Sequence, residues 1–486
     1  MAPEPTATSA ASVAPATTAW TSSDPELEAY LQRTKERRLA EYIEFLRIPS
    51  ISGLPEHAGD VRAAAEWLGA RLQAAGLEHV EVCKTGGHPI VYVDWLHAGD
   101  APTAVVYGHY DVQPVDPEEE WTSPPFEPAV VTDADGRQRI LARGASDDKS
   151  NITIIVQAVQ ALLATRGSIP INLRFVFEGE EESASASLEP WLAANRHRLG
   201  GDVALICDSG FFAGNLPAIT TSLRGLVYVQ IDVTGPFQDV HSGVYGGMVA
   251  NPGNALAQII AALKDPDGTI RIPGFYDDVI PLTDAERAAF AALPFDEEAA
   301  RRALDVPELV GEPGYTTLER IGARPTLDVC GIWGGFEGEG PKTIIPAHAH
   351  AKISCRLVAN QDPERIFELV AAYIGRVAPS SVRYSITRLG DGKPSLTPID
   401  NPATQAAVRA LETTFGVAPL YIREGGSVPV CASFESILGL STVLFGFAPP
   451  DGQFHAPNEW MSMANYETGI RAIARYWDEI AAVDHL

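Results

Sequence analysis

The sequence feature that most constrains the fold is a short apolar segment that ends in a run of acidic residues. The segment INLRFVFEGEEESAS spans residues 171–185 and places four glutamates among the five residues 178–182. Apolar side chains fill most of its first half, which is typical of a strand buried on both faces of a parallel sheet. The carboxylates would then lie where a buried strand ends, the edge at which open α/β sheets bind ligands. A solvated charge run on a helix is the alternative interpretation.

Similar apolar segments recur through the first half of the chain and alternate with helix-like segments. Asp24, as an N-cap, and Pro25 begin an amphipathic pattern that predicts a helix at the N-terminal end. Residues 149–167 form a second helical pattern, long enough to cross over between parallel strands. Together these patterns predict an α/β fold. The expected strands lie within residues 88–96, 103–111, 171–181 and 202–210.

The pattern changes near residue 224, where strands with period-two alternation begin. Residues 225–235 and 349–358 have the half-buried pattern of an antiparallel sheet. We therefore expect a second domain inserted into the first. The expected limits are a disordered tail at 1–22, the first part of the larger domain at 23–223, the inserted domain at 224–390 and the second part of the larger domain at 391–486.

Charge and cysteine content exclude several classes of protein. The net charge of −27 disfavours nucleic acid and anionic membranes as partners. No apolar run approaches the roughly 20 residues that a membrane span needs, and the first 22 residues lack the pattern of a signal peptide. The five cysteines are scattered, with no CxxC pair. They predict neither a disulfide framework nor a cysteine zinc site, and they favour a cytoplasmic location.

Histidines and carboxylates follow several of the predicted strands. Each has an ordinary alternative, because a single histidine is commonly a surface residue and an aspartate before a helix commonly caps it. Their coincidence at neighbouring strand ends favours a metal site, since clustered carboxylates otherwise repel one another. The residues concerned are His109, Asp111, Asp147, Asp148, Glu181, Glu182, Asp208 and His455.

The ligand types restrict the metal. Two histidines with carboxylates and no thiolate suit zinc, with manganese or cobalt as alternatives. The number of acidic residues suggests two divalent ions, because about three carboxylates and a hydroxide would nearly neutralise four positive charges.

Six ordered motifs resemble a known family. YGHYDVQP, RGASDDK, EGEEESAS, HSGVYGGM, REGGSVP and FHAPNEW are similar to motifs of the dinuclear zinc hydrolases that include carnosinases and other cytosolic dipeptidases, aminoacylases, succinyl-diaminopimelate desuccinylase and carboxypeptidase G. KTIIP, REGGSVP and the long inserted domain look most like the carnosinase-like dipeptidases. The resemblance implies a zinc aminopeptidase-like catalytic domain, with a mixed, largely parallel sheet flanked by helices. It also implies an inserted α+β lid and dimerisation domain.

The resemblance also assigns roles to the clustered residues. It implies that Asp147 bridges two ions, one shared by His109 and Asp208 and the other by Glu182 and His455. Asp111 would orient His109, Glu181 would act as general base, and the peptide bond between Asp147 and Asp148 would be cis. Glu178 and Glu180 would be solvated or structural members of the acidic run.

Residues of the inserted domain and of the REGGSVP motif are expected to bind substrate. The resemblance implies that His241 reaches the active site of a second subunit, so that the enzyme is a homodimer. It also implies that Arg356, Gly426 and Ser427 hold the free carboxylate of a small peptide. The alternatives are a polar turn for His241, and a surface arginine with an ordinary turn for the others. The pair His348 and His350 could bind metal on a strand, but the corresponding family positions are not ligands.

The resemblance predicts a dipeptidase that uses a metal-activated water. An amidohydrolase acting on N-acyl or N-carbamoyl amino acids is the alternative within enzymes. A catalytically silent binding protein is the alternative outside them, but such a protein would be expected to have lost Glu181 or a metal ligand.

Overall fold

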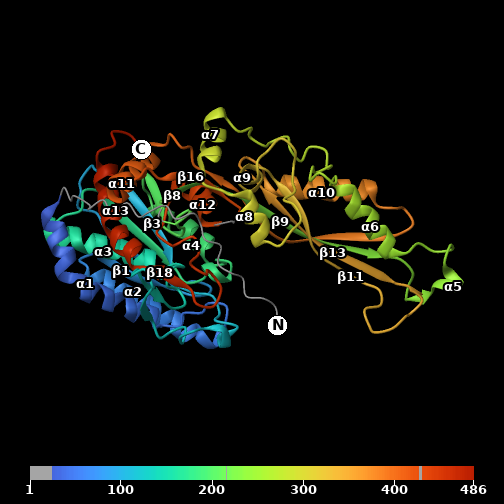
Figure 1. Ribbon diagram of the computed structural model, residues 1–486, viewed down its shortest axis with the longest axis horizontal. Helices are drawn as coiled ribbons and strands as arrows, with labels where there is room; N and C mark the ends of the chain where they lie inside the picture. Colours follow the sequence, from blue (N-terminus) through green and yellow to red (C-terminus); the bar gives the residue numbers. More distant parts are fainter. Residues whose placement is uncertain (1–23, 215, 426–428) are drawn as a thin grey trace. The chain divides into compact units, whose positions relative to one another are not determined.

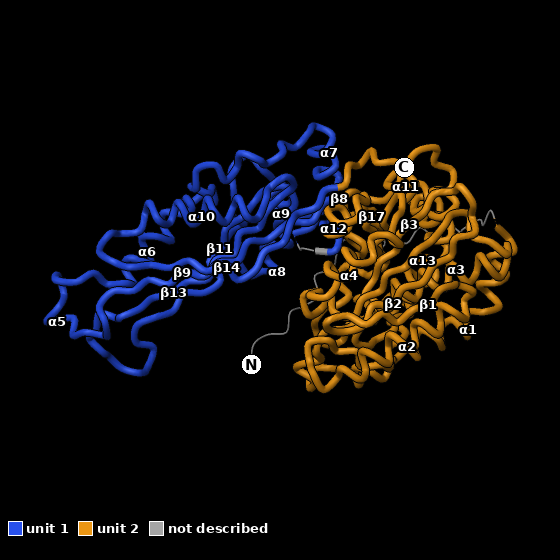
Figure 2. The backbone as a smooth tube through the Cα atoms, turned by 180° about the vertical axis from the view of Figure 1, so that it is seen from behind, with its two compact units in different colours: residues 1–8, 222–396, 423–432 blue, residues 9–221, 397–422, 433–486 orange. Residues whose placement is uncertain are grey.

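The computed structural model describes residues 24–214, 216–425 and 429–486, and the chain divides into two compact units (Figures 1 and 2). Among these residues, unit 1 comprises 222–396 and the described part of 423–432, and unit 2 comprises 24–221, 397–422 and 433–486. The expected tail at 1–22 and the residues Gly426 and Ser427 lie outside the described residues. None of the described helices is long and apolar enough to cross a membrane.

The main sheet of unit 2 is mixed, with four parallel strands at its centre. The first seven strands of this nine-stranded sheet follow the order β1-β2-β6-β3-β7-β17-β8. Strands β6, β3, β7 and β17 pair in parallel, whereas β1, β2 and β8 pair antiparallel with their neighbours. These strands are β1 (Glu78–Cys83), β2 (Ile90–Trp95), β3 (Thr103–His109), β6 (Asn172–Glu178), β7 (Val203–Ile206), β8 (Ala218–Leu223) and β17 (Thr442–Leu444). The predicted α/β fold with a largely parallel sheet is therefore confirmed.

Helices cover both faces of this sheet, which explains the continuous apolar runs of the central strands. Val106 of β3 belongs to the large hydrophobic cluster that includes α1, α2, α3, α11 and α13. The next residue, Tyr107, points to the other face, where its ring meets that of Phe434 edge to face. The helices of unit 2 are α1 (Pro25–Leu46), α2 (Ala58–Ala74), α3 (Lys149–Arg166), α4 (Leu188–Asn195), α11 (Pro402–Phe415) and α13 (Met463–Ala481).

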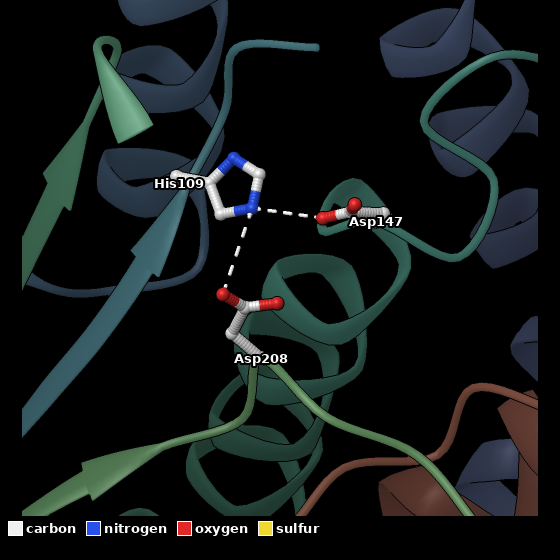
Figure 3. A group of neighbouring side chains, drawn as sticks. All are labelled: His109, Asp147 and Asp208. Carbon is white, nitrogen blue, oxygen red and sulfur yellow. Dashed lines mark hydrogen bonds and ion pairs between the residues drawn. The ribbon is translucent and has the colours of Figure 1, made fainter. Parts of the chain in front are cut away.

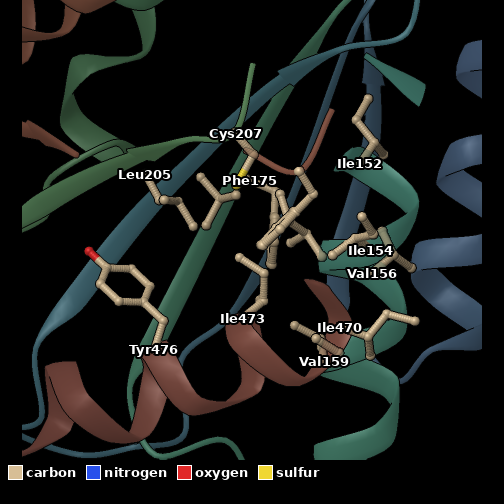
Figure 4. Packing of buried hydrophobic residues seen from close by; sticks show 14 of the residues in the cluster. Ile152, Ile154, Val156, Val159, Phe175, Leu205, Cys207, Ile470, Ile473 and Tyr476 are labelled. Atoms are coloured by element: carbon tan, nitrogen blue, oxygen red, sulfur yellow. The ribbon is translucent and has the colours of Figure 1, made fainter. Parts of the chain in front are cut away.

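The predicted N-terminal and crossover helices are both present and have ordinary ends. Asp24 caps α1 by accepting a hydrogen bond of 3.0 Å from the backbone N–H of Leu27. Helix α3 ends at Arg166 and is capped by Gly167, whose φ of +69° suits glycine. Side chains of α3 and α13 pack together beside those of β6 and β7 (Figure 4). This packing fixes the start of α3 relative to the sheet.

A small sheet in unit 2 joins two distant parts of the sequence. Strand β5 (Gln138–Leu141) pairs antiparallel with both β4 (Ala129–Thr132) and β18 (Trp460–Ser462). Trp460 is the partner of Leu141 in this ladder. The segment before α3 and the segment before α13 are therefore neighbours.

Unit 1 is built on a four-stranded antiparallel sheet of order β11-β13-β9-β14. Buried residues alternate with half-buried ones along β9 and β13, because α6 and α10 pack on one face only. The strands are β9 (Gly225–Thr234), β11 (Thr326–Trp333), β13 (His348–Leu357) and β14 (Arg383–Gly392), and short pairs form from β10 (Val240–His241) with β12 (Ile344–Ile345). The helices are α5 (Ser242–Tyr245), α6 (Pro252–Leu263), α7 (Asp284–Ala292), α8 (Glu297–Ala303), α9 (Thr317–Ala323) and α10 (Pro363–Val377). β15 (Ser395–Leu396) is a short strand of this unit, and β16 (Leu420–Glu424) and α12 (Pro429–Ser433) contain residues of both units.

Candidate metal centre

The predicted ligands all belong to unit 2 and meet at one edge of its sheet. His109 is the last residue of β3, and its register partner on β6 is Glu178. Because the two strands are parallel, the turn that follows β6 begins beside His109. The other predicted ligands follow β6 (Glu182), follow β7 (Asp208), precede α3 (Asp147) and precede β18 (His455).

Asp147 is shared by two groups of potential ligands. One group is His109, Asp147 and Asp208, and the other is Asp147, Glu182 and His455; within each, one ligand atom per residue lies within 4.8 Å of the others. Nε2 of His109 lies 3.0 Å from Oδ1 of Asp147 and 3.9 Å from Oδ2 of Asp208 (Figure 3). Nε2 of His455 lies 2.9 Å from Oδ2 of Asp147 and 3.2 Å from Oε2 of Glu182. The two carboxylate oxygens of Asp147 therefore face different histidines.

The side chains of this cluster fit divalent metal ions. Two imidazoles and three carboxylates are suitable ligands for zinc and related metals. Oε1 of Glu182 is buried and has no hydrogen-bond partner among the described residues, so it can accept a cation. The two groups contain the residues that the family resemblance assigns to two ions, and the role of these residues as ligands stays a prediction.

The electrostatics of the cluster also favour a cation. Burial raises the pKa of the Asp208 carboxyl well above its usual value, and the nearby carboxylates of Asp147 and Glu181 raise it further. Burial opposes the charged form of His109, but hydrogen bonds to Asp111 and Asp147 raise its pKa well above the usual value. Without a cation, the Asp208 carboxyl therefore favours its protonated form and the His109 imidazole its charged form. A divalent cation would supply the positive charge instead.

Asp111 links His109 to the acidic turn. Its side chain is fully buried, and Oδ1 lies 3.4 Å from Nδ1 of His109. The same carboxylate accepts backbone hydrogen bonds from Glu181 (3.3 Å) and Glu182 (3.1 Å). One carboxylate can therefore hold both the imidazole ring and the turn that carries the next two predicted functional residues.

Glu181 lies in the turn that follows β6 and is not a member of either ligand group. Burial raises the pKa of its carboxyl to about 7; His109 opposes this shift, whereas Glu182 and Asp147 increase it. A carboxyl with this pKa can both accept and return a proton near neutral pH.

The neighbouring acidic residues are buried and structural rather than solvated. Glu178 is 1% exposed and accepts hydrogen bonds from the hydroxyls of Tyr107 and Ser185. Glu180 is also buried and accepts from the backbone N–H groups of His88 and Ser187. These contacts fix the two ends of the turn.

Asp148 does not cap α3 with its side chain. Its carboxylate accepts from the backbone N–H of His109 (3.3 Å) and from the side-chain amide of Asn151 (2.8 Å). The Asp147–Asp148 peptide bond is cis, as the resemblance implies.

Two further residues contact the predicted ligands and were not singled out from the sequence. Gln113 donates a hydrogen bond of 2.7 Å from Nε2 to Oε2 of Glu182. Glu459 accepts a hydrogen bond of 3.0 Å from the backbone N–H of Asp147. Gln113 lies in the motif YGHYDVQP and Glu459 in the motif FHAPNEW. Their place in these motifs is the only sequence signal that could have indicated them.

The described residues expected to bind substrate, His241 and Arg356, belong to unit 1 and are not members of the metal-ligand groups. His241 is exposed, and its Nδ1 accepts a hydrogen bond of 2.9 Å from the N–H of Gly243. Arg356 is half-buried on β13, opposite Thr326 on β11. His350 contacts Asp232 at 2.6 Å, and it forms no three-residue metal group within the described chain.

Comparison with known proteins identifies the family. Residues 105–479 match the sequence profile of peptidase family M20/M25/M40. The chain belongs to this family. The M20 relatives also extend over nearly the whole chain, so the predicted resemblance is confirmed and the protein is a hydrolase.

The relatives include a metallodipeptidase, a dipeptidase and a metallo-carboxypeptidase. The chain is 30% identical to the Cys-Gly metallodipeptidase dug1 of Schizosaccharomyces pombe over 94% of this chain and 98% of the relative. It is 32% identical to the human Beta-Ala-His dipeptidase over 85% and 82%, respectively. The structure of an M20 metallo-carboxypeptidase from Sulfolobus solfataricus matches with a TM-score of 0.79 at 31% identity, over 92% of this chain and 99% of that one.

Proposed function

We propose that this protein is a metal-dependent dipeptidase that hydrolyses the peptide bond of dipeptides or very short peptides. The observation that carries the proposal is the position of Asp147, whose two oxygens face the two histidines of separate ligand groups. The shared carboxylate supports a site for two ions, with zinc as the proposed metal and manganese or cobalt as alternatives. Two of the M20 relatives are dipeptidases, which supports the choice of substrate.

His109 and Asp208 would hold one ion, Glu182 and His455 the other, and Asp147 would contact both. When bound, the ions would acidify a water molecule and polarise the peptide carbonyl. Glu181 would accept the proton of the attacking water and return it to the leaving amine nitrogen. Its raised pKa suits both transfers, and its place outside the ligand groups keeps the carboxylate available.

The substrate would be held by residues of unit 1, which we propose contains a lid domain at residues 224–390 between catalytic parts at 23–223 and 391–486. Arg356 suits the free carboxylate of a dipeptide, because its guanidinium can pair with both oxygens. Gly426 and Ser427 are proposed to complete this contact. His241 from a second copy would donate a hydrogen bond to the carbonyl oxygen as negative charge develops there.

A homodimer through the lid domain is part of this proposal. Large apolar side chains near His241 are exposed, with Phe237 at 85% and Met248 at 76%. Such residues favour contact with a second copy over exposure to water. We also propose a cytoplasmic location, which all five cysteines support because none of them forms a disulfide.

Amine release from matched panels of free dipeptides and N-acyl amino acids tests the proposed substrate class. The purified protein would be loaded with zinc or manganese, and a chelated sample would serve as control. We expect chelator-sensitive cleavage of the dipeptides and little cleavage of the N-acyl amino acids. Cleavage confined to the N-acyl amino acids would overturn the dipeptidase assignment and leave the metal site in place.

A further inference from the structure

Glu459 is a buried carboxylate with an unusual set of partners. It is 0% exposed, and its two oxygens accept four hydrogen bonds. Oε2 accepts from Nη1 of Arg143 (2.8 Å) and from the backbone N–H of Gly144 (2.9 Å). Oε1 accepts from the backbone N–H groups of Ser146 (2.8 Å) and Asp147 (3.0 Å). Three of the four donors are therefore main-chain groups of the loop that carries Asp147.

The backbone next to Glu459 is attached to the same loop. Its carbonyl accepts from the N–H of Ala142, and the carbonyl of Trp460 accepts from the hydroxyl of Ser146 at 2.7 Å. These bonds extend the β5–β18 ladder up to the loop. Because the N–H of Asp147 points to Glu459, the backbone of Asp147 is fixed while its side chain faces His109 and His455.

Glu459 also lies four residues after His455, in a segment that is held on its other side. Oδ1 of Asn458 accepts from the N–H and the hydroxyl of Thr122, and its side-chain amide donates to the carbonyl of Glu120. The segment of His455 and the loop of Asp147 therefore meet at the Glu459 carboxylate. Removing that carboxylate would take three main-chain hydrogen bonds from the loop of Asp147 and loosen the contact of this loop with the His455 segment.

We propose that Glu459 is a positioning residue that fixes Asp147 and the His455 segment, so that its carboxylate controls the affinity of both metal sites. This inference rests on the proposed two-metal site. A residue that positioned a ligand of a single ion would affect one site only. Glu459 would affect both sites, because Asp147 belongs to both ligand groups. Loss of the Glu459 carboxylate should weaken both sites in parallel.

The substitution Glu459→Gln tests this inference with little change in size. A carboxamide has one acceptor oxygen, and its NH₂ group would face main-chain donors of the loop. The matched control is Glu467→Gln on α13. The Glu467 carboxylate pairs with the buried Arg38, with 2.7 Å between Oε2 and Nη2, and the substitution removes its charge. Glu467 belongs to neither ligand group. A loss of affinity that came only from the lost stability of an Arg–Glu pair would therefore appear in both variants.

Cobalt titrations of the full-length, metal-stripped proteins would measure both dissociation constants by visible absorption, with circular dichroism and Tm as checks of folding. We expect Glu459→Gln to weaken both sites by roughly 10- to 100-fold, as is typical for partners of metal ligands. Glu467→Gln should bind both ions as the wild type does. Wild-type affinity in Glu459→Gln, or a loss at one site alone, would overturn the inference. An equal loss in Glu467→Gln would also overturn it.

A second variant covers the case in which Glu459→Gln does not fold. Arg143→Lys keeps a positive charge near Glu459 but cannot reproduce the contacts of the guanidinium to both Glu459 and the carbonyl of Pro114. We expect a smaller, parallel weakening at both sites, and unchanged affinities would contradict the inference. A wild-type protein that binds no divalent ion would instead overturn the proposed function itself.

Discussion

Gln113 donates a hydrogen bond from Nε2 to Oε2 of Glu182 at 2.7 Å, while Oε1 of Glu182 is buried without a hydrogen-bond partner among the described residues. The amide thereby holds one oxygen of the carboxylate and leaves the other for a cation. Gln113→Met keeps the length of the side chain and removes the donor. We expect the ion held by Glu182 and His455 to bind roughly tenfold more weakly, since partners of ligands have effects of this size. Cobalt titration should show an unchanged affinity at the site of His109 and Asp208. An equal loss of affinity at both sites would argue against this role.

The strand ends could be predicted from the sequence because local patterns determine them. Five of the seven residues 171–177 are apolar, and the end of this largely apolar segment at Glu178 marks the end of β6. His109 ends β3 in the same way, so that its place beside the acidic turn follows from parallel pairing.

The supporting contacts could not be predicted, because their partners are distant in sequence. Glu459 binds main-chain groups more than 300 residues away, and apart from its place in the motif FHAPNEW no local pattern distinguishes it from an exposed glutamate before a strand. Glu178 likewise forms part of a charge run in sequence, but pairing of β6 with β3 places it against Tyr107. Such contacts depend on tertiary structure, whereas the sequence patterns describe single elements.

The burial of Glu178 predicts a pH-dependent change in stability of the metal-free protein. Burial raises the pKa of this carboxyl from 4.5 to about 7, although hydrogen bonding to Tyr107 opposes the shift. Between these values the folded protein binds more protons than the unfolded chain, so the free energy of unfolding falls as the pH rises. Above pH 7 the full destabilisation is present.

Glu178→Gln removes this titration and keeps a carbonyl oxygen that can accept from Tyr107 and Ser185. We expect the variant to gain stability over the wild type as the pH rises from 5.5 to 8, by a difference on the order of 2 kcal/mol. Denaturant unfolding in the presence of a chelator would measure it. A stability difference that does not change with pH would contradict this origin.

The proposed dimer predicts that two inactive variants restore activity when they are mixed. In His241→Ala the donor is missing, and in Glu181→Gln the base is missing. A mixed dimer contains one site with an intact Glu181 and a His241 from the other subunit. Random exchange should therefore recover about one quarter of the wild-type turnover. Absence of recovery, when subunit exchange is shown separately, would exclude a role for His241 across the dimer.

The proposed carboxylate contact of Arg356 predicts a substrate-dependent defect. Arg356→Ala should raise the KM for a dipeptide roughly tenfold or more, since a hydrogen bond to a charged group contributes about 1.5–3 kcal/mol. The KM for the same dipeptide with a C-terminal amide should change little. Arg388→Ala, which removes an arginine that pairs with Glu364 in the same unit, serves as the control. An equal effect of Arg356→Ala on both substrates would contradict the contact.

The most direct test of the account is the turnover of a free dipeptide by Glu181→Gln, measured together with its bound metal. The substitution removes the proposed base and alters no member of the two ligand groups. We expect two bound ions, as in the wild type, and loss of nearly all turnover. A variant that keeps its metal and cleaves the dipeptide at near wild-type rate would show that Glu181 is not the base and would contradict the proposed mechanism.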